Sequence, residues 1–416
     1  MEIISSRNLI NVITKTLNLI DKRLIEHGER VGYIMLKMLQ CEKKYGNDEI
    51  LNFVLASVFH DIGAYKIEEL DKMVQFETDT VENHSIYGYL FYKYLSPFDD
   101  TAKIILYHHL DYNKLKQYKY KYSDVAAYIN IADRIDVISF ISNNKLNLRY
   151  LRKYGDVRYS NKGLDLFEKA NRQYKIIDNI NNGSYKTELF QILEGIELSL
   201  DRKEKFLKML IFSIDFRSEY TVMHTITTVS IADEIGRRMN LTEIERQYLH
   251  FAALVHDVGK ITTPLEILES VNKLSSEEMK VMRNHVVMSE HILKDYINPE
   301  VLEIAIRHHE KLDGSGYPKK LTEKDLTLPQ RILAVADIIS ALSGKRSYKD
   351  VFSKEKIVSI LTKDKDEGKL CKDVVDCSIA NFNDIMLNVE KNTSASLKMY
   401  SEMKDRFDEI YRKLAV

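Results

Sequence analysis

Ten of the twelve histidines in this chain fall into two series with the same order of residues. Each series has a histidine, a His-Asp pair, a second histidine, a His-His pair and a final aspartate. The first series is His27, His60, Asp61, His84, His108, His109 and Asp133. The second series is His224, His256, Asp257, His285, His308, His309 and Asp337. Because the first gap is 33 residues in one series (27 to 60) and 32 in the other (224 to 256), we infer an internal duplication.

These residue types point to metal chemistry. Neutral imidazole nitrogens and carboxylate oxygens bind Zn, Mn, Fe and Ni. Each series offers more ligands than one tetrahedral site uses, and suits two metals about 3.5–4 Å apart that share a water. Such a pair activates the water and stabilises phosphoryl oxygens, so we expect hydrolysis of a phosphoester. A single histidine is more often a packing or surface residue, and we interpret His250 and His291, outside both series, in that way.

The elements that must position these residues are expected to be helices. Four helix starts are predicted by capping boxes or by a proline in the first turn, at Thr242, Ser275, Asn298 and Pro329. The helices that follow would carry or end at His256, His285, His308 and Asp337. Only 15 Gly and 5 Pro occur in 416 residues, too few for the many turns of a β protein. The predicted fold is all-α, with two tandem domains at residues 1–200 and 201–416.

Composition narrows the functional classes. Hydrophobic residues make up 44% and charged residues 30%, which is typical of a soluble globular protein. With 61 basic and 62 acidic residues, no overall basic field would attract a nucleic acid polymer or an anionic membrane. The three scattered cysteines do not suggest a disulfide framework, and no long apolar segment suggests a signal peptide or a membrane span. We therefore expect a cytoplasmic protein.

Two motifs carry a family resemblance. HDVGK at 256–260 and HHEKLDGSGYP at 308–318 resemble the signature of the HD-GYP subgroup of the HD superfamily of metal-dependent phosphohydrolases. The resemblance covers about residues 210–390 as an HD-GYP domain and about 10–200 as a divergent HD domain. It implies an all-α fold with two divalent metal ions, usually iron or manganese. It further implies hydrolysis of the 3′–5′ phosphodiester bonds of a cyclic dinucleotide, above all cyclic di-GMP.

The resemblance also assigns roles to residues. The whole second series would bind the metals, with Asp257 as the bridging ligand and Lys260 in contact with the scissile phosphate. The mouth of the site would be shaped by Gly314, Gly316, Tyr317 and Pro318. Arg346 and Tyr348 match a family pattern for holding phosphate or base, although by composition they read as a solvated turn. Some relatives hold a third metal through a Glu four residues before the first histidine. Tyr220 occupies that position here, with Glu219 one residue out of register, so we expect two metals.

The first series departs from this pattern on the substrate side. Ala64 replaces the lysine found at 260, with Lys66 nearby as a substitute, and HHLDYNKLKQYKY replaces the glycine-rich loop. We therefore expect the first domain to bind metal but to differ in substrate or to regulate the second. Two alternatives stay open: a phosphohydrolase acting on other nucleotides, and a non-catalytic nucleotide-sensing module. A second copy of the chain or a signalling protein also stays open as a partner.

Overall fold

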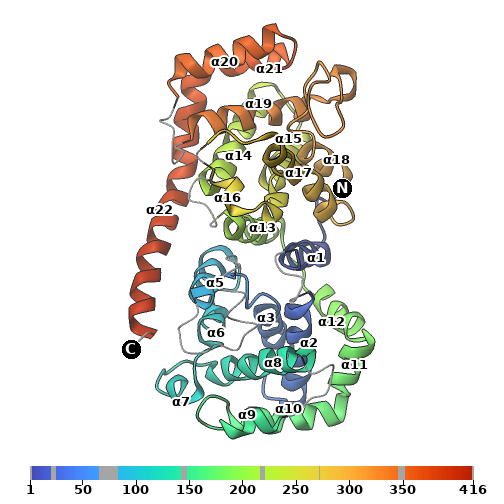
Figure 1. Ribbon diagram of the computed structural model, residues 1–416, viewed down its shortest axis with the longest axis vertical. Helices are drawn as coiled ribbons and strands as arrows, with labels where there is room; N and C mark the ends of the chain where they lie inside the picture. The colour runs from blue at the N-terminus through green and yellow to red at the C-terminus, as the bar shows by residue number, and fades with distance from the viewer. Residues whose placement is uncertain are drawn as a thin grey trace. The chain divides into compact units, whose positions relative to one another are not determined.

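The computed structural model describes residues 2–19, 25–64, 83–141, 148–215, 221–270, 272–344 and 352–414. Within these ranges the regular elements are helices, and the β-type pairing consists of two isolated bridges, Gly155 with Tyr159 and Asp313 with Thr322. The prediction of an all-α protein is confirmed (Figure 1). Several predicted residues lie outside the described ranges: Lys66, Glu219, Tyr220, Arg346 and Tyr348.

The chain forms two compact units. The N-terminal unit comprises residues 13–209 and 403–416, and the C-terminal unit comprises residues 1–12 and 210–402. Three helices contain the boundaries between units: α1 (Ser6–Leu17), α13 (Leu200–Asp215) and α22 (Phe382–Leu414). We keep 1–200 and 201–416 as the proposed extents of the duplicated domains, since the two units differ from them mainly at the chain ends.

The N-terminal unit is built around α2 (His27–Glu42), which packs against α3 (Asn47–Val58), α8 (Ser123–Ile141) and α10 (Asn161–Tyr174). The other helices of this unit are α5 (Asn83–Leu95), α6 (Ala102–Tyr107), α7 (Tyr112–Leu115), α9 (Arg149–Lys153), α11 (Ile176–Asn182) and α12 (Tyr185–Glu194). The last turns of α22 also belong here, and the Phe407 ring stacks on Tyr87 with centroids 4.3 Å apart. Large side chains such as Tyr33, Phe53 and Tyr92 are fully buried in its core.

In the C-terminal unit, α14 (Thr221–Arg238) packs against α15 (Glu243–Val255) and α19 (Leu328–Ser343). The short 3-10 helix Val258–Thr262 packs against α17 (Ser276–Leu293), and α15 packs against α18 (Pro299–Ala305). The remaining helices are α16 (Leu265–Leu268), α20 (Lys354–Asp366) and α21 (Lys372–Ala380).

The predicted helix starts are confirmed. Thr242 and Ser275 close capping boxes at the starts of α15 and α17, and the Asn298 side chain accepts a hydrogen bond at the start of α18. Helix α19 begins one residue before Pro329 and is capped by Thr327. These caps satisfy backbone N–H groups that a helix start leaves without partners. They also set where each helix begins, and the helical register from there leads to the histidines.

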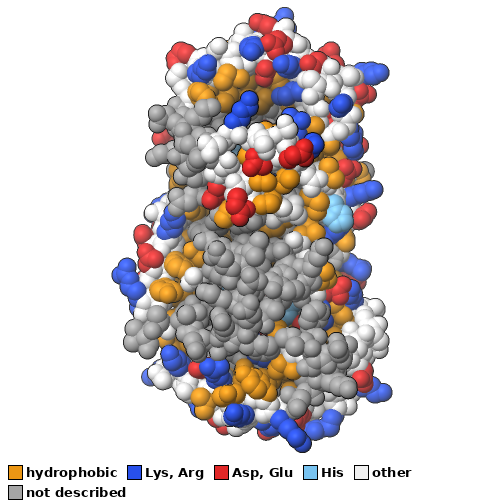
Figure 2. Space-filling view, viewed as in Figure 1, with side chains coloured by type: hydrophobic (Ala, Val, Ile, Leu, Met, Phe, Trp, Pro, Cys, Tyr) orange, Lys and Arg blue, Asp and Glu red, His pale blue; other side chains and the backbone are white. Residues whose placement is uncertain are grey.

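The nearly equal numbers of acidic and basic residues are reflected on the molecular surface. Acidic and basic side chains are interspersed on the surface visible in Figure 2. None of the described helices combines the length and the apolar composition needed to cross a membrane.

Candidate metal centres

The structure gathers each series of histidines and aspartates into one cluster. We call the second series (His224, His256, Asp257, His285, His308, His309 and Asp337) the C-terminal cluster. We call the first series (His27, His60, Asp61, His84, His108, His109 and Asp133) the N-terminal cluster. Ligand-type atoms in each cluster form two groups whose members lie within 4.8 Å of one another. The predicted residues are therefore brought together in both units, while metal binding itself stays a prediction.

Local helix geometry orients half of the ten imidazoles in the two clusters. In five of them the Nδ1 atom lies 2.5–2.8 Å from the backbone carbonyl oxygen three residues earlier, in His60, His108, His256, His285 and His308. An Nδ1–H that donates to a carbonyl fixes the ring orientation and the tautomer. The Nε2 lone pair then points toward the cluster, which is the arrangement of a neutral imidazole ligand.

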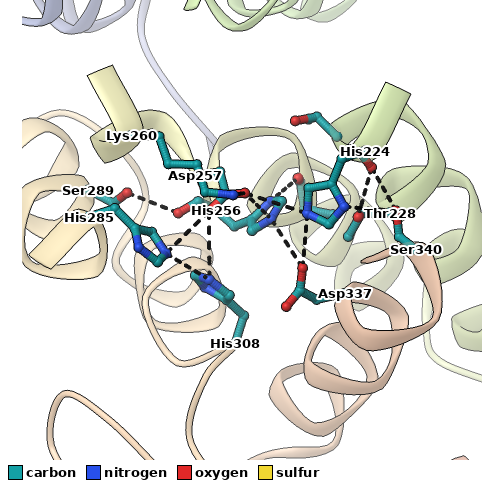
Figure 3. A network of polar contacts seen from close by, with 12 residues as sticks. His224, Thr228, His256, Asp257, Lys260, His285, Ser289, His308, Asp337 and Ser340 are labelled. Carbon is teal, nitrogen blue, oxygen red and sulfur yellow. Dashed lines mark hydrogen bonds and ion pairs between the residues drawn. The ribbon is translucent and has the colours of Figure 1, made fainter. Parts of the chain in front are cut away.

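Asp257 lies at the centre of the C-terminal cluster and faces four histidines (Figure 3). Its Oδ2 atom is 3.5 Å from His224 Nε2 and 3.1 Å from His256 Nε2. Its Oδ1 atom is 3.3 Å from His285 Nε2 and 3.9 Å from His308 Nε2. Because each oxygen faces a different pair of histidines, one carboxylate can bridge two metal positions.

Asp337 closes the other side of the C-terminal cluster. Its Oδ1 atom is 3.0 Å from His224 Nε2 and 3.8 Å from His256 Nε2, and its Oδ2 atom is 3.7 Å from His309 Nδ1. The carboxylate therefore contacts both groups of histidines. Helix α19 supplies it, as the sequence predicted, from the middle of a buried helical face.

Burial and neighbouring charges set the protonation of this cluster in the absence of metal. Burial alone would raise the pKa of Asp257, but His256 and Lys260 hold that pKa well below its usual range. Burial lowers the pKa of His308, and it lowers the pKa of His309 to about 3. Burial also opposes the charged form of His224, but Asp257 and Asp337 raise its pKa to about 9. His308 and His309 are thus neutral and ready to bind metal, whereas His224 must first lose a proton.

Gly259 allows the turn after Asp257 to approach α17. A Cβ atom on Gly259 would lie 2.0 Å from the His285 backbone oxygen and 2.5 Å from the Ser289 nitrogen. The Ser289 hydroxyl lies 2.9 Å from the Gly259 nitrogen, whose hydrogen bond it accepts, and donates to the His256 carbonyl oxygen, also at 2.9 Å. These contacts fix His285 relative to His256. The sequence analysis did not single out this glycine, although both series have Gly two residues after the His-Asp aspartate.

The N-terminal unit repeats this close approach. A Cβ atom on Gly63 would lie 2.1 Å from the His84 backbone oxygen and 2.5 Å from the Gly88 nitrogen. Gly63 therefore has the same packing role as Gly259.

Two polar side chains outside the two series support His224. Its Nδ1–H donates to the Ser340 hydroxyl at 3.0 Å, and that hydroxyl donates to the His224 carbonyl oxygen, also at 3.0 Å. The buried Asp215 accepts a hydrogen bond from the Thr225 hydroxyl at 2.8 Å, next in sequence to His224. Burial raises the pKa of Asp215 to about 6. Both contacts limit how α14 can present His224 to the cluster.

Lys260 supplies the cation beside Asp257. Its ammonium donates to Asp257 Oδ2. Burial alone would lower the pKa of Lys260, but the Asp257 carboxylate raises it, so the side chain is charged at neutral pH. The structure therefore places the predicted cation at the central carboxylate of the cluster.

The predicted mouth residues lie in one loop after His309. This loop contains Gly314, Gly316, Tyr317 and Pro318. The centroids of the Tyr317 and His309 rings lie 4.7 Å apart. The Arg283 guanidinium lies over the Tyr317 ring, 4.9 Å from its centroid. Gly314 has φ +78°, and a Cβ on Gly316 would lie 2.4 Å from the Lys311 nitrogen. Both glycines are needed for the loop to hold Tyr317 beside the cluster.

Asp61 repeats the bridging geometry in the N-terminal cluster. Its Oδ1 atom is 3.5 Å from His84 Nε2 and 3.8 Å from His108 Nε2. Its Oδ2 atom is 3.7 Å from His27 Nε2 and 3.4 Å from His60 Nε2. The two clusters therefore share their central arrangement.

The support of the first histidine differs between the clusters. His27 Nδ1 lies 2.8 Å from Asp136 Oδ2, where the C-terminal cluster uses Ser340. Arg30 also binds Asp136, with Nε 2.6 Å from Oδ1. Burial opposes the charged form of His27, but Asp133 and Asp136 raise its pKa to about 10. A carboxylate partner makes His27 a more basic ligand than His224.

Both clusters contain buried nitrogen and oxygen atoms without a hydrogen-bond partner, which fits metal binding. Several buried ligand-type atoms make no hydrogen bond: Nε2 of His27, His60, His108 and His256, both Asp61 oxygens, and Asp257 Oδ1. Buried polar atoms in native proteins nearly always have a partner, and a metal ion accounts for nitrogens and oxygens that converge on one point. His250 instead contacts Asp233 at 2.9 Å, in keeping with its interpretation as an ordinary histidine.

The fold and the clusters define a class: helical domains that assemble histidines and aspartates around a central carboxylate, present here twice. Models of the HD domain match residues 24–138 and residues 207–370. The chain belongs to the HD-domain family, with two HD domains in tandem, and is homologous to phosphodiesterases of the HD-GYP type.

Individual relatives cover different parts of the chain. The 3′3′-cGAMP-specific phosphodiesterase 1 of Vibrio cholerae is 26% identical over 91% of this chain and 92% of its own length. A cyclic di-GMP phosphodiesterase of Thermotoga maritima is 33% identical over 43% of this chain and 51% of its own length. The crystal structure of a cyclic GMP-AMP-specific phosphodiesterase of V. cholerae covers 92% of this chain and 98% of its own, with TM-score 0.59 and 17% identity, which shows a shared fold.

Proposed function

We propose that the chain hydrolyses a phosphodiester bond of a cyclic dinucleotide at the C-terminal cluster. It is a cyclic-dinucleotide phosphodiesterase of the HD-GYP type. The observation that carries this assignment to the C-terminal cluster is the position of Asp257, whose two oxygens face two pairs of histidines, with Lys260 alongside. A carboxylate in this position is suited to hold two cations at one scissile phosphate.

The proposed cofactors are two divalent metal ions, iron or manganese. All seven residues of the C-terminal cluster would hold them, with Asp257 as the bridging ligand. A mixed set of imidazoles and carboxylates suits these metals. When bound, such ions supply Lewis acidity, which activates water and withdraws charge from phosphoryl oxygens.

The protein's own residues would then position the substrate. Lys260 provides a compact positive charge for the scissile phosphate. Tyr317 provides an aromatic ring next to His309, and Arg283 over that ring adds a second cation at the mouth. Gly314, Gly316 and Pro318 hold the loop that carries this ring. Arg346 and Tyr348 remain proposed contacts for phosphate or base.

For the substrate we propose 3′3′-cGAMP, with cyclic di-GMP as the second candidate. The sequence analysis expected cyclic di-GMP. The relative that matches nearly the whole chain, including both HD domains, is specific for 3′3′-cGAMP, and this favours that substrate. The cyclic di-GMP phosphodiesterase of T. maritima matches about half as much of the chain, which favours cyclic di-GMP as the alternative.

For the N-terminal cluster we propose metal binding with a regulatory role or a different ligand. Its seven ligand-type residues repeat the C-terminal arrangement. The lysine beside the bridging aspartate and the glycine-rich loop are both missing from it. Its chemistry toward a dinucleotide should therefore differ.

The test is hydrolysis by the full chain loaded anaerobically with Fe²⁺ or Mn²⁺. Samples would receive 3′3′-cGAMP, cyclic di-GMP or linear dinucleotides, and products would be identified by mass. We expect a linear product from a cyclic dinucleotide and a higher kcat/KM for 3′3′-cGAMP. A loaded protein that leaves every cyclic dinucleotide intact refutes the proposal, and a higher kcat/KM for cyclic di-GMP refutes the choice of substrate.

A further inference from the structure

Each cluster has a basic side chain beside one of its aspartates, but at a different place. The C-terminal cluster has Lys260 three residues after its bridging aspartate, and the corresponding residue of the N-terminal cluster is Ala64. The N-terminal cluster has Arg134 directly after its last aspartate, and the corresponding residue of the C-terminal cluster is Ile338. The basic side chain thus lies beside Asp257 in the C-terminal cluster and beside Asp133 in the N-terminal cluster.

Arg134 lies against the N-terminal cluster. The residue is 4% exposed, its Nε atom lies 3.6 Å from Asp133 Oδ2, and its Nη2 atom lies 3.4 Å from His109 Nδ1. A buried guanidinium is costly unless its charge is compensated. Its position between a carboxylate and an imidazole of the cluster makes it part of the electrostatics of the site.

The two clusters also differ in how far their central aspartate is exposed to solvent. The Asp61 side chain is 17% exposed, whereas the Asp257 side chain, covered by Lys260, is 6% exposed. Asp61, with Ala64 in place of a lysine, is therefore more exposed to solvent than Asp257.

We propose that Arg134 makes the N-terminal cluster a second binding site, for a phosphate-bearing ligand. The inference rests on the metal binding proposed above for this cluster. The guanidinium would bind a phosphate oxygen while other oxygens of that phosphate face the metals. A guanidinium has five N–H donors in a fixed fork, so the Asp133 carboxylate and a phosphate oxygen can share it. Because the cation stands at the opposite end from that of Lys260, the phosphate binds in a different orientation.

The experiment uses the full chain with Asp257→Asn, which disables the C-terminal cluster, loaded with Mn²⁺. Elemental analysis gives the Mn²⁺ content, and titration calorimetry gives the affinity for inorganic phosphate. We expect Arg134→Gln to weaken phosphate binding by about 10-fold or more, since it removes a charge-assisted hydrogen bond, with Mn²⁺ content unchanged. Arg152→Gln is the matched control: it removes an arginine of the same unit that pairs with Asp165 on the surface, and should leave phosphate affinity unchanged.

The outcomes separate the two proposals. Phosphate binding that is equally tight with Arg134→Gln, or equally weakened by Arg152→Gln, refutes the role of Arg134 alone. A folded protein that holds no Mn²⁺ in the N-terminal cluster refutes the metal proposal, and this inference with it. Arg134→Lys keeps the buried charge and serves if the glutamine variant does not fold. It should bind phosphate more weakly than the arginine, and equal affinity would overturn the proposal.

Discussion

Replacing Asp257 with Asn removes one negative charge from the centre of the C-terminal cluster while keeping the size of the side chain. The amide offers one neutral oxygen where the carboxylate presents Oδ2 at 3.1 Å from His256 Nε2 and Oδ1 at 3.3 Å from His285 Nε2. Loss of a residue that merely supports a metal ligand costs about 10- to 100-fold in affinity or activity. For the bridging ligand itself we expect kcat/KM to fall by at least about 100-fold, together with metal content.

The assay combines metal analysis, hydrolysis of 3′3′-cGAMP and thermal unfolding on the same samples. Lys260 would lose the negative charge of its partner, and breaking a buried ion pair costs up to about 3–5 kcal/mol. Asp337 and Asp215 also stabilise the Lys260 charge, so the loss should be smaller and the variant should still fold. Asp233→Asn is the control, because it makes the same change beside His250. An Asp257→Asn protein with unchanged turnover would exclude the C-terminal cluster as the catalytic centre.

Three further predictions concern pH, packing and the N-terminal cluster. His224, with its pKa of about 9, must lose a proton to bind metal. In a pH series, Mn²⁺ affinity and hydrolysis should therefore rise from about pH 6 toward pH 9. Activity should collapse below about pH 6. A flat profile, or full activity after long exposure to excess chelator, contradicts this. Gly259→Ala should destabilise the fold by about 1–3 kcal/mol in denaturant titrations and lower metal content, since its Cβ would overlap the His285 backbone. Gly46→Ala, where a Cβ meets nothing within 4 Å, is its control, and equal effects would refute the packing argument. Asp61→Asn should remove the metal of the N-terminal cluster and, if that cluster is regulatory, change turnover at the C-terminal one; unchanged elemental analysis would contradict the N-terminal site.

Much of the site could be predicted from the sequence because the same order of histidines and aspartates occurs twice in the chain. Capping residues such as Thr242 and Ser275 gave the helix starts, because a cap is a local interaction between residues a few positions apart. The order of histidines gave the two clusters, which the structure brings together. The bridging orientation of Asp257 required the family resemblance in addition to the residues themselves.

Contacts between distant segments could not be predicted from the sequence. Gly259 is needed because the backbone of α17 passes 2.0 Å from where its Cβ would be, and no local pattern contains that distance. The position of Arg134 beside His109 likewise depends on how α8 packs against the segment after α6. The sequence analysis looked for a replacement for Lys260 near Ala64, whereas the cation beside Asp133 and His109 is Arg134 of α8.

The most direct test of the binuclear centre is anomalous diffraction from crystals of the metal-loaded full chain at the Mn or Fe absorption edge. We expect two peaks in the C-terminal cluster, about 3.5–4 Å apart, one on each side of the Asp257 carboxylate. One peak should lie among His224, His256 and Asp257, and the other among His285, His308 and His309. A single peak, or metal bound away from Asp257 in a protein that hydrolyses cyclic dinucleotides, would contradict it.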